Sequence, residues 1–190
     1  RQFTVTVIDA QAPVISCPGN ITVNNTTGVC GAVLNYATPV GTDNCAGAIT
    51  TMTAGLASGS TFPIGTTTVT YLVTDAAGFT ASCSFTVTVI DAQAPSISCP
   101  ANITVSASVG TCAALVNYTA PVGTDNCVGA ITTMTAGLPS GSTFPIGTTT
   151  ITYQVVDAAG LTASCSFTVT VIDAEAPIIA CPANIVTNND

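Results

Sequence analysis

Hydrophobic and polar residues alternate along much of this chain. Two clear examples are Phe85-Thr-Val-Thr-Val-Ile90 and Thr68-Val-Thr-Tyr-Leu-Val-Thr74. Successive side chains of a strand point to opposite faces, so this pattern predicts strands that each bury one face. No segment shows the period of an amphipathic helix. The residues expected to point inward are Phe85, Val87 and Val89 in one strand and Val69, Tyr71 and Val73 in the other.

Turn-forming residues divide the chain between these strands. Gly, Asn, Asp and Pro favour tight turns because they adopt or stabilise the backbone angles that turns require. Short strands separated by frequent turns predict an all-β fold, a β-sandwich of about seven strands. The turn signals fall at 24–28, 41–44, 58–59, 63–65 and 75–78.

The pattern repeats at a spacing of 82 residues. Asp9-Ala-Gln-Ala-Pro returns as Asp91-Ala-Gln-Ala-Pro and again as Asp173-Ala-Glu-Ala-Pro. A fixed period of this kind is typical of tandem modules, so we expect a part of a longer array. The predicted domains are the last strand of a preceding repeat (1–8), two full repeats (9–90 and 91–172) and the start of a further, incomplete repeat (173–190).

The composition excludes several classes of function. The chain has one basic residue, nine acidic residues and no histidine, with a net charge of −8. Binding to nucleic acid requires basic residues at the phosphates, so nucleic acid is not an expected partner. No apolar stretch approaches the roughly 20 residues of a membrane span.

The same composition argues against an enzyme. Ser-His and Cys-His pairs require histidine, and Schiff-base chemistry requires lysine; the chain has neither residue. A pair of carboxylates, Asp43 and Asp75, is conceivable as a hydrolytic site. Both fall in turn motifs that explain them better, so we predict no catalytic residues.

Each full repeat contains four cysteines. The shortest gap, from Cys17 to Cys30, is far longer than the roughly two to four residues that separate paired zinc ligands. The cysteines therefore predict disulfides, which form in oxidising compartments. We expect an extracellular or cell-surface protein.

Several motifs resemble the hyalin repeat, or HYR, domain family. They are Ile15-Ser-Cys-Pro18 with Asn20-Ile-Thr-Val23, Cys30-Gly-Ala-Val33, Thr42-Asp-Asn-Cys45, Gly59-Ser-Thr-Phe-Pro-Ile-Gly-Thr66 and Asp75-Ala-Ala-Gly78 followed by Cys83-Ser-Phe-Thr-Val87. The resemblance implies tandem immunoglobulin-like sandwiches outside the cell, with roles in adhesion or matrix and no enzymatic activity. Arg1 departs from the pattern, because the other copies have cysteine at that position.

The immunoglobulin-like fold implied by this resemblance suggests a disulfide pairing. Its first and last strands can run side by side in parallel, which would place Cys17 beside Cys83 and leave Cys30 to pair with Cys45. A bridge from Cys45 to Cys83 remains an alternative. The cysteines expected in the corresponding bonds of the second repeat are Cys99 with Cys165 and Cys112 with Cys127.

Each repeat also has three aspartates and no cation to pair with them. In a sandwich of this topology they should gather near the junction between repeats, where Ca²⁺ would relieve their repulsion. The alternative is that they stabilise turns through hydrogen bonds to the backbone. No other cofactor is expected. The candidate calcium ligands are Asp9, Asp43, Asp75, Asp91, Asp125 and Asp157.

Sequons for N-glycosylation suggest a surface modified by sugar. Those that we consider candidates lie at Asn20, Asn24, Asn25, Asn102 and Asn117.

Taken together, these features predict a structural array that forms an extracellular stalk, surface fibre or filament with an adhesive role. Its partners would be neighbouring repeats or identical chains in a fibre, together with glycans or cell-surface proteins. The alternative is a ligand-binding adhesin module, or an accessory domain of a larger secreted protein that binds carbohydrate or protein. The alternative predicts exposed aromatic residues for sugar stacking, and the chain has no Trp and four Tyr.

Overall fold

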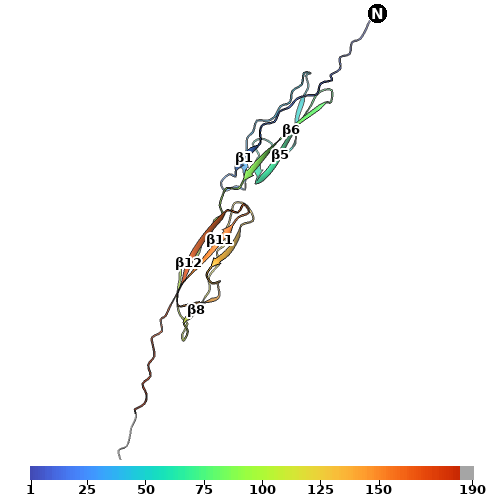
Figure 1. Cartoon of the computed structure of the whole chain (residues 1–190). Coiled ribbons are helices and arrows are strands. Elements are labelled where there is room, and N and C mark those ends of the chain that lie inside the picture. Colours follow the sequence, from blue (N-terminus) through green and yellow to red (C-terminus); the bar gives the residue numbers. More distant parts are fainter. Residues whose placement is uncertain (185–190) are drawn as a thin grey trace, which may run out of the picture. The chain divides into compact units, whose positions relative to one another are not determined.

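The computed structural model describes residues 1–184, and every regular element in that range is a strand (Figure 1). The all-β prediction is therefore confirmed. Each full repeat contributes six strands and one isolated bridge. The bridge pairs Val14 with Thr42 in the first repeat and Ser96 with Thr124 in the second. The strands are β1 (Ile21–Asn24), β2 (Gly31–Val33), β3 (Ile49–Ala54), β4 (Thr61–Pro63), β5 (Gly65–Thr74), β6 (Thr80–Ile90), β7 (Ile103–Ser106), β8 (Ala113–Val116), β9 (Ile131–Ala136), β10 (Ser142–Pro145), β11 (Gly147–Val156) and β12 (Thr162–Ile172).

The first repeat has a main sheet with the strand order β1-β6-β5-β3, and β2 pairs with β4 in a second sheet. The strands β5 and β6 form a long antiparallel pair, which Asp75 to Gly78 connect through a turn. The short strand β1 joins the other edge of β6 in parallel, with Ile21 opposite Val87. This parallel pairing of the first and last strands determines where the cysteines lie.

The core of the first repeat lies between its two sheets. All six residues expected to point inward from β5 and β6 are buried. Phe62 of β4 is fully buried opposite them, and the Tyr36 ring packs edge-on against Phe85 with 5.1 Å between ring centroids. The Tyr36 hydroxyl donates to the Leu56 carbonyl at 2.7 Å and lies 3.1 Å from the Tyr71 hydroxyl. Burial, and then the neighbouring Tyr71, raise the pKa of Tyr36 to about 12.

The second repeat reproduces this arrangement. Its main sheet has the order β7-β12-β11-β9, and β10 pairs with β8. Ile151 and Phe167 are buried at the positions of Val69 and Phe85. Only a small residue fits at Gly41 and its counterpart Gly123. A Cβ on Gly41 would lie 2.5 Å from the Val73 side chain.

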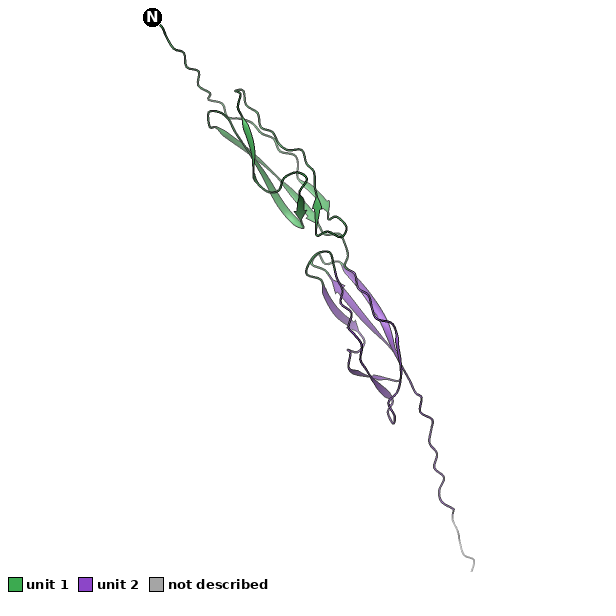
Figure 2. Cartoon of the chain, turned by 180° about the vertical axis from the view of Figure 1, so that it is seen from behind, with its two compact units in different colours: residues 1–95, 125–130, 157–161 green, residues 96–124, 131–156, 162–190 purple. Residues whose placement is uncertain are grey.

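The chain forms two compact units whose boundaries differ from those of the sequence repeats (Figure 2). Unit 1 contains residues 1–95 together with two loops of the second repeat, 125–130 and 157–161. Unit 2 contains 96–124, 131–156 and the chain from residue 162 onward. Unit 1 therefore includes Cys127, a cysteine of the second repeat.

The segment 1–8, expected to be a last strand, forms no strand in this structure. It repeats the sequence of the end of β6, but Phe3 is 85% exposed where Phe85 is 2% exposed. β6 is held between β1 and β5, whereas the segment has no such strand beside it among the described residues. Residues 173–184 likewise form no strand, and 185–190 lie outside the described residues.

Candidate functional site

One disulfide staples each repeat. Cys17 precedes β1 and bonds to Cys83 within β6, with 5.6 Å between the Cα atoms. Cys99 bonds to Cys165 in the same way. These are the pairs expected from parallel first and last strands. Each bond closes a loop of 66 residues, which contributes roughly 4 kcal/mol in the chain-entropy account.

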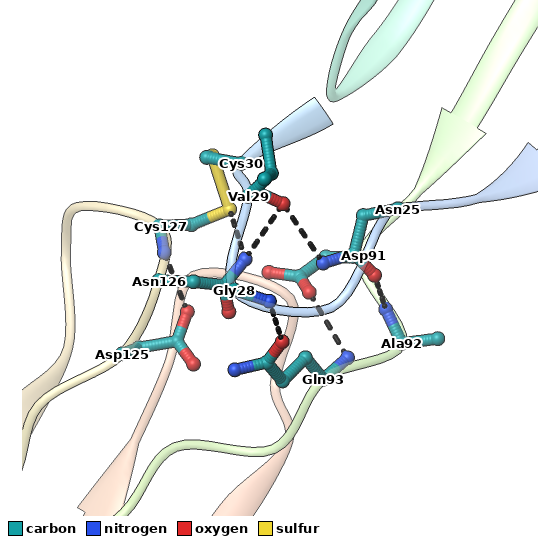
Figure 3. The surroundings of a disulfide bond; sticks show 10 residues. All are labelled: Asn25, Gly28, Val29, Cys30, Asp91, Ala92, Gln93, Asp125, Asn126 and Cys127. Atoms are coloured by element: carbon teal, nitrogen blue, oxygen red, sulfur yellow. Dashed lines mark hydrogen bonds between the residues drawn. A yellow bond between two sulfur atoms is a disulfide. The ribbon is translucent and has the colours of Figure 1, made fainter. Parts of the chain in front are cut away.

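The expected pairs Cys30–Cys45 and Cys112–Cys127 are wrong. Cys30 bonds to Cys127, with 4.8 Å between the Cα atoms (Figure 3). Cys45 and Cys112 carry free thiols. Cys181 also carries a free thiol. The bond joins a cysteine of the first repeat to the counterpart of Cys45 in the second.

The course of β6 explains why Cys30 cannot reach Cys45. The loop that carries Cys30 follows β1 and lies at the end of β6, where the Asn25 amide donates to the Ile90 carbonyl at 2.9 Å. Cys45 lies beside Asp9, where the chain enters the repeat. β6 separates these two places because it spans the length of the sandwich from Thr80 to Ile90.

Hydrogen bonds surround the Cys30–Cys127 bond within unit 1 (Figure 3). The Gly28 amide donates to Gln93 Oε1 at 2.6 Å. The Val29 carbonyl accepts from Asn126 Nδ2 at 3.0 Å. Asn25 Oδ1 accepts from the Ala92 amide at 3.0 Å. The loop of residues 25–30 is thus held by the linker that begins at Asp91 as well as by the disulfide.

The structure brings two of the three predicted aspartates of each set together, with a cysteine beside them. Ligand atoms of Asp9, Asp43 and Cys45 lie within 4.8 Å of one another. Asp91, Asp125 and Cys127 form the equivalent group in unit 1. Asp75 and Asp157 lie outside these groups at that distance.

Every one of these aspartates stabilises a turn. Asp75 Oδ1 accepts from the Phe79 amide at 2.8 Å, and Asp157 Oδ1 accepts from the Leu161 amide at 2.8 Å. The other four accept from a backbone amide two residues later: Asp9 from Gln11, Asp43 from Cys45, Asp91 from Gln93 and Asp125 from Cys127. The turn role that the sequence suggested is therefore present at all six positions.

Four of the six aspartates keep a second oxygen that is buried and has no hydrogen-bond partner in the described structure. Asp75 and Asp157 are each 6% exposed, and in both the unpaired atom is Oδ2. A buried carboxylate oxygen without a donor is costly. The turn hydrogen bonds therefore account for only half of each carboxyl group. The remaining unpaired oxygens are Asp9 Oδ2 and Asp125 Oδ1.

The carboxylates also act on the free thiol of Cys45. The neighbouring Asp9 carboxylate is the main cause that raises the pKa of Cys45, and the charges of Asp43 and Asp75 add to it. Asp75 therefore influences the Cys45 thiol through its charge, although its carboxylate oxygens lie outside the group of Asp9, Asp43 and Cys45. The thiolate is the reactive form of cysteine, so a raised pKa slows the reactions of Cys45 near neutral pH.

The candidate glycosylation sites differ in what their side chains do. Asn20 and Asn102 each accept a hydrogen bond from the last strand of their repeat, at the amides of Thr86 and Thr168. Asn25 uses both ends of its amide, because its Nδ2 also donates to Val29 at 3.2 Å. Asn24 and Asn117 are exposed. Glycosylation stays a prediction at all five.

Comparison with known proteins identifies the family. The HYR domain matches residues 8–89 and 90–171, and the chain belongs to the HYR domain family. It is 41% identical to hyalin of Strongylocentrotus purpuratus over 97% of this chain and 16% of hyalin. It is 30% identical to a serine-rich adhesin for platelets of Staphylococcus aureus over 84% of this chain and 8% of the adhesin. A structure of protocadherin gamma B2 aligns with 87% of this chain and 41% of its own length, at 16% identity and a TM-score of 0.42.

This chain therefore spans less than a fifth of the length of each of these two relatives. The family and its relatives point to an extracellular or cell-surface protein. Among the described residues, no helix is long and apolar enough to cross a membrane.

Sequence reasoning missed the groups that surround the Cys30–Cys127 bond. Neither Gln93 nor Asn126 was a predicted site residue, although Asn126 lies between Asp125 and Cys127 and Gln93 follows Asp91 by two residues. The one available signal was the period itself, because a cysteine can pair with a cysteine of the next repeat as well as with one of its own.

We predict that Asp9→Asn makes Cys45 more reactive. Removal of the Asp9 charge should lower the pKa of the thiol and raise its rate of alkylation by iodoacetamide near neutral pH roughly two- to tenfold. The rate would be measured against pH in a chain that also carries Cys112→Ser and Cys181→Ser, so that Cys45 is the free thiol. Asp91→Asn, the same change one repeat later, should leave the profile unchanged. Identical profiles for Asp9→Asn and the parent would contradict the contact.

Proposed function

We propose that this chain is part of a non-enzymatic, extracellular array of HYR domains that forms a stalk, surface fibre or filament with an adhesive role. The staple between the first and last strands of each repeat is the observation that carries the proposal. Membership of the HYR family and similarity to an adhesin support it. The absence of histidine and lysine from the sequence supports a role without catalysis.

The position of the staple suits a domain that resists force. In an array, tension enters each repeat near its first residues and leaves after its last strand. In the first repeat Cys17 follows the entering linker and Cys83 lies in the last strand. Tension would therefore pass through the disulfide and along β6 to the exit, and would bypass the chain between the two cysteines. The hydrophobic core of the repeat would then stay folded under loads that stretch the linkers.

A role in binding carbohydrate has less support. Flat sugar faces usually stack on exposed aromatic rings, and the four tyrosines of this chain belong to or pack against the two cores. Glycans and cell-surface proteins remain proposed partners of the adhesive role, at sites that involve hydrogen bonding more than ring stacking.

Pulling single molecules from both ends tests the mechanical part of this proposal. We expect the oxidised chain to release little length, because each staple withholds 66 residues, or roughly 220 Å at about 3.4 Å per residue. Reduction should add one such step for each repeat. A chain with Cys30→Ser, Cys99→Ser and Cys165→Ser should show one long step without reductant, because no disulfide then bridges the second repeat. Equal extension of the oxidised and reduced chains would contradict the proposal.

We also propose that the aspartates bind Ca²⁺ near the start of each repeat. Ca²⁺ prefers carboxylate oxygens, and its weakest sites occur in extracellular modules. The support is the buried oxygen that four aspartates leave without a partner, together with the absence of a basic side chain from their repeats. Asp9 and Asp43 would supply ligands in the first repeat. Asp75, which lies farther from them, would contribute the oxygen that has no hydrogen-bond partner. Asp91, Asp125 and Asp157 would supply ligands in the second repeat.

Thermal unfolding with and without Ca²⁺ tests the metal site. At a concentration about tenfold above a millimolar Kd, Ca²⁺ should stabilise the chain by about 1.4 kcal/mol for each site and raise Tm by several degrees. Asp75→Asn keeps the oxygen that accepts from Phe79 but replaces the unpaired one with an amide. The variant should lose part of the rise, and Asp75→Asn with Asp157→Asn should lose most of it. A parent chain whose Tm does not respond to Ca²⁺ would exclude the site.

A further inference from the structure

The Cys30–Cys127 bond connects two kinds of cysteine that every full repeat possesses. Cys30 and Cys112 are equivalent by the repeat, and so are Cys45 and Cys127. The bond therefore joins the first kind in one repeat to the second kind in the next. Cys45 and Cys112, two of the three free thiols, are the remaining member of each kind.

The loop that carries Cys112 already has the fold of the bonded Cys30 loop. In the Cys30 loop, the Asn25 amide donates to Ile90 at 2.9 Å and the Thr26 amide to Gly31 at 2.8 Å. The corresponding bonds in the free loop run from Ala107 to Ile172 at 2.8 Å and from Ser108 to Ala113 at 2.8 Å.

The following linker supports the free loop as well. The Gly110 amide donates to Glu175 Oε2 at 2.9 Å, one repeat after the bond from Gly28 to Gln93. Because Cys112 is exposed in a loop of this kind, it is presented as Cys30 is.

The loop that carries Cys45 is likewise folded as the bonded loop is. The Cys45 amide donates to Asp43 at 2.8 Å, as the Cys127 amide does to Asp125 at 2.8 Å. The two cysteines differ in solvent exposure: the bonded Cys127 is 8% exposed and therefore buried, whereas the free Cys45 is exposed.

Beside each of the two thiols lies an open hollow in which a loop of a further repeat could pack. Cys112 borders a hollow with Gly110, Thr111, Asp173 and Glu175. Cys45 borders one with Asp9, Gln11 and Asn44. Asn44 is the counterpart of Asn126, which donates to the Val29 carbonyl beside the formed bond.

We propose that Cys45 and Cys112 are attachment sites for further repeats of this kind. Cys112 would bond to the Cys45-type cysteine of the repeat that follows, and Cys45 to the Cys30-type cysteine of the repeat that precedes. Consecutive repeats are then joined twice, by the linker and by a disulfide, through any length of array. Loops that already have the bonded shape lose little conformational freedom when the bond forms. The inference concerns how repeats are joined and does not depend on the proposed adhesive role.

Formation of each bond is a two-electron oxidation. The two thiols lose two protons and two electrons as the sulfur–sulfur bond forms. A small disulfide such as oxidised glutathione accepts them and becomes two glutathione thiols, through a mixed disulfide with one of the cysteines. An oxidising extracellular compartment supplies such an oxidant.

A chain lengthened by one repeat tests the inference. Residues 91–172 are duplicated in frame after residue 172, and the chain is folded in a glutathione redox buffer. The duplicate carries Val128→Ile at a position that is 92% exposed, which marks the peptide of its Cys127 counterpart by mass. Mass spectrometry without reduction should find Cys112 joined to the marked peptide. Of thirteen cysteines, nine plus the four added, ten should be in disulfides and three free.

Two comparisons make the result decisive. In the lengthened chain, Cys112→Ser should remove one disulfide and raise the free thiols from three to four. In the parent chain, the same substitution should remove no disulfide and lower the free thiols from three to two. A lengthened chain in which Cys112 stays free, or pairs with Cys127 of its own repeat, would overturn the inference.

Discussion

The parallel pairing of β1 with β6 decides where the cysteines of a repeat lie. It places the residues before β1 beside the middle of β6, which allows Cys17 to bond to Cys83. It also brings the end of β1 to the end of β6, so that the loop with Cys30 meets the linker that leaves the repeat. One strand pair thus gives each repeat an internal staple and a cysteine at its exit. The bond from Cys30 to Cys127 follows from that position.

Two aspartates of each set lie beside Cys45 or Cys127, and a third lies outside these groups. Each caps a turn, and these turns fix the loops that present Cys45 and Cys127. The same carboxylates raise the pKa of the Cys45 thiol, which slows its reactions near neutral pH. Their unpaired oxygens are the basis for the proposed Ca²⁺ site. A single set of residues would then shape a loop, slow the reactions of a thiol and hold a cation.

Much of the fold could be predicted from the sequence. Alternation in β5 and β6 identified the buried residues, since a strand that buries one face must alternate, and the period located the repeats. The staple was expected because the immunoglobulin-like fold implied by the family resemblance can place its first and last strands, and with them Cys17 and Cys83, side by side. The bond of Cys30 could not be obtained in this way. Its partner depends on which end of the sandwich each loop occupies, and pairing was considered only within one repeat. The unpaired oxygens were also out of reach, because burial of single atoms depends on packing.

The connection from Cys30 to Cys127 is the central claim of this account, and a disulfide map of the oxidised chain tests it most directly. Digestion without reduction should yield one linked peptide pair that contains these two cysteines, and thiol counting should find three free thiols among nine cysteines. Pairing inside each repeat would instead yield Cys30 linked to Cys45, Cys112 linked to Cys127 and a single free thiol at Cys181. That result would contradict the account.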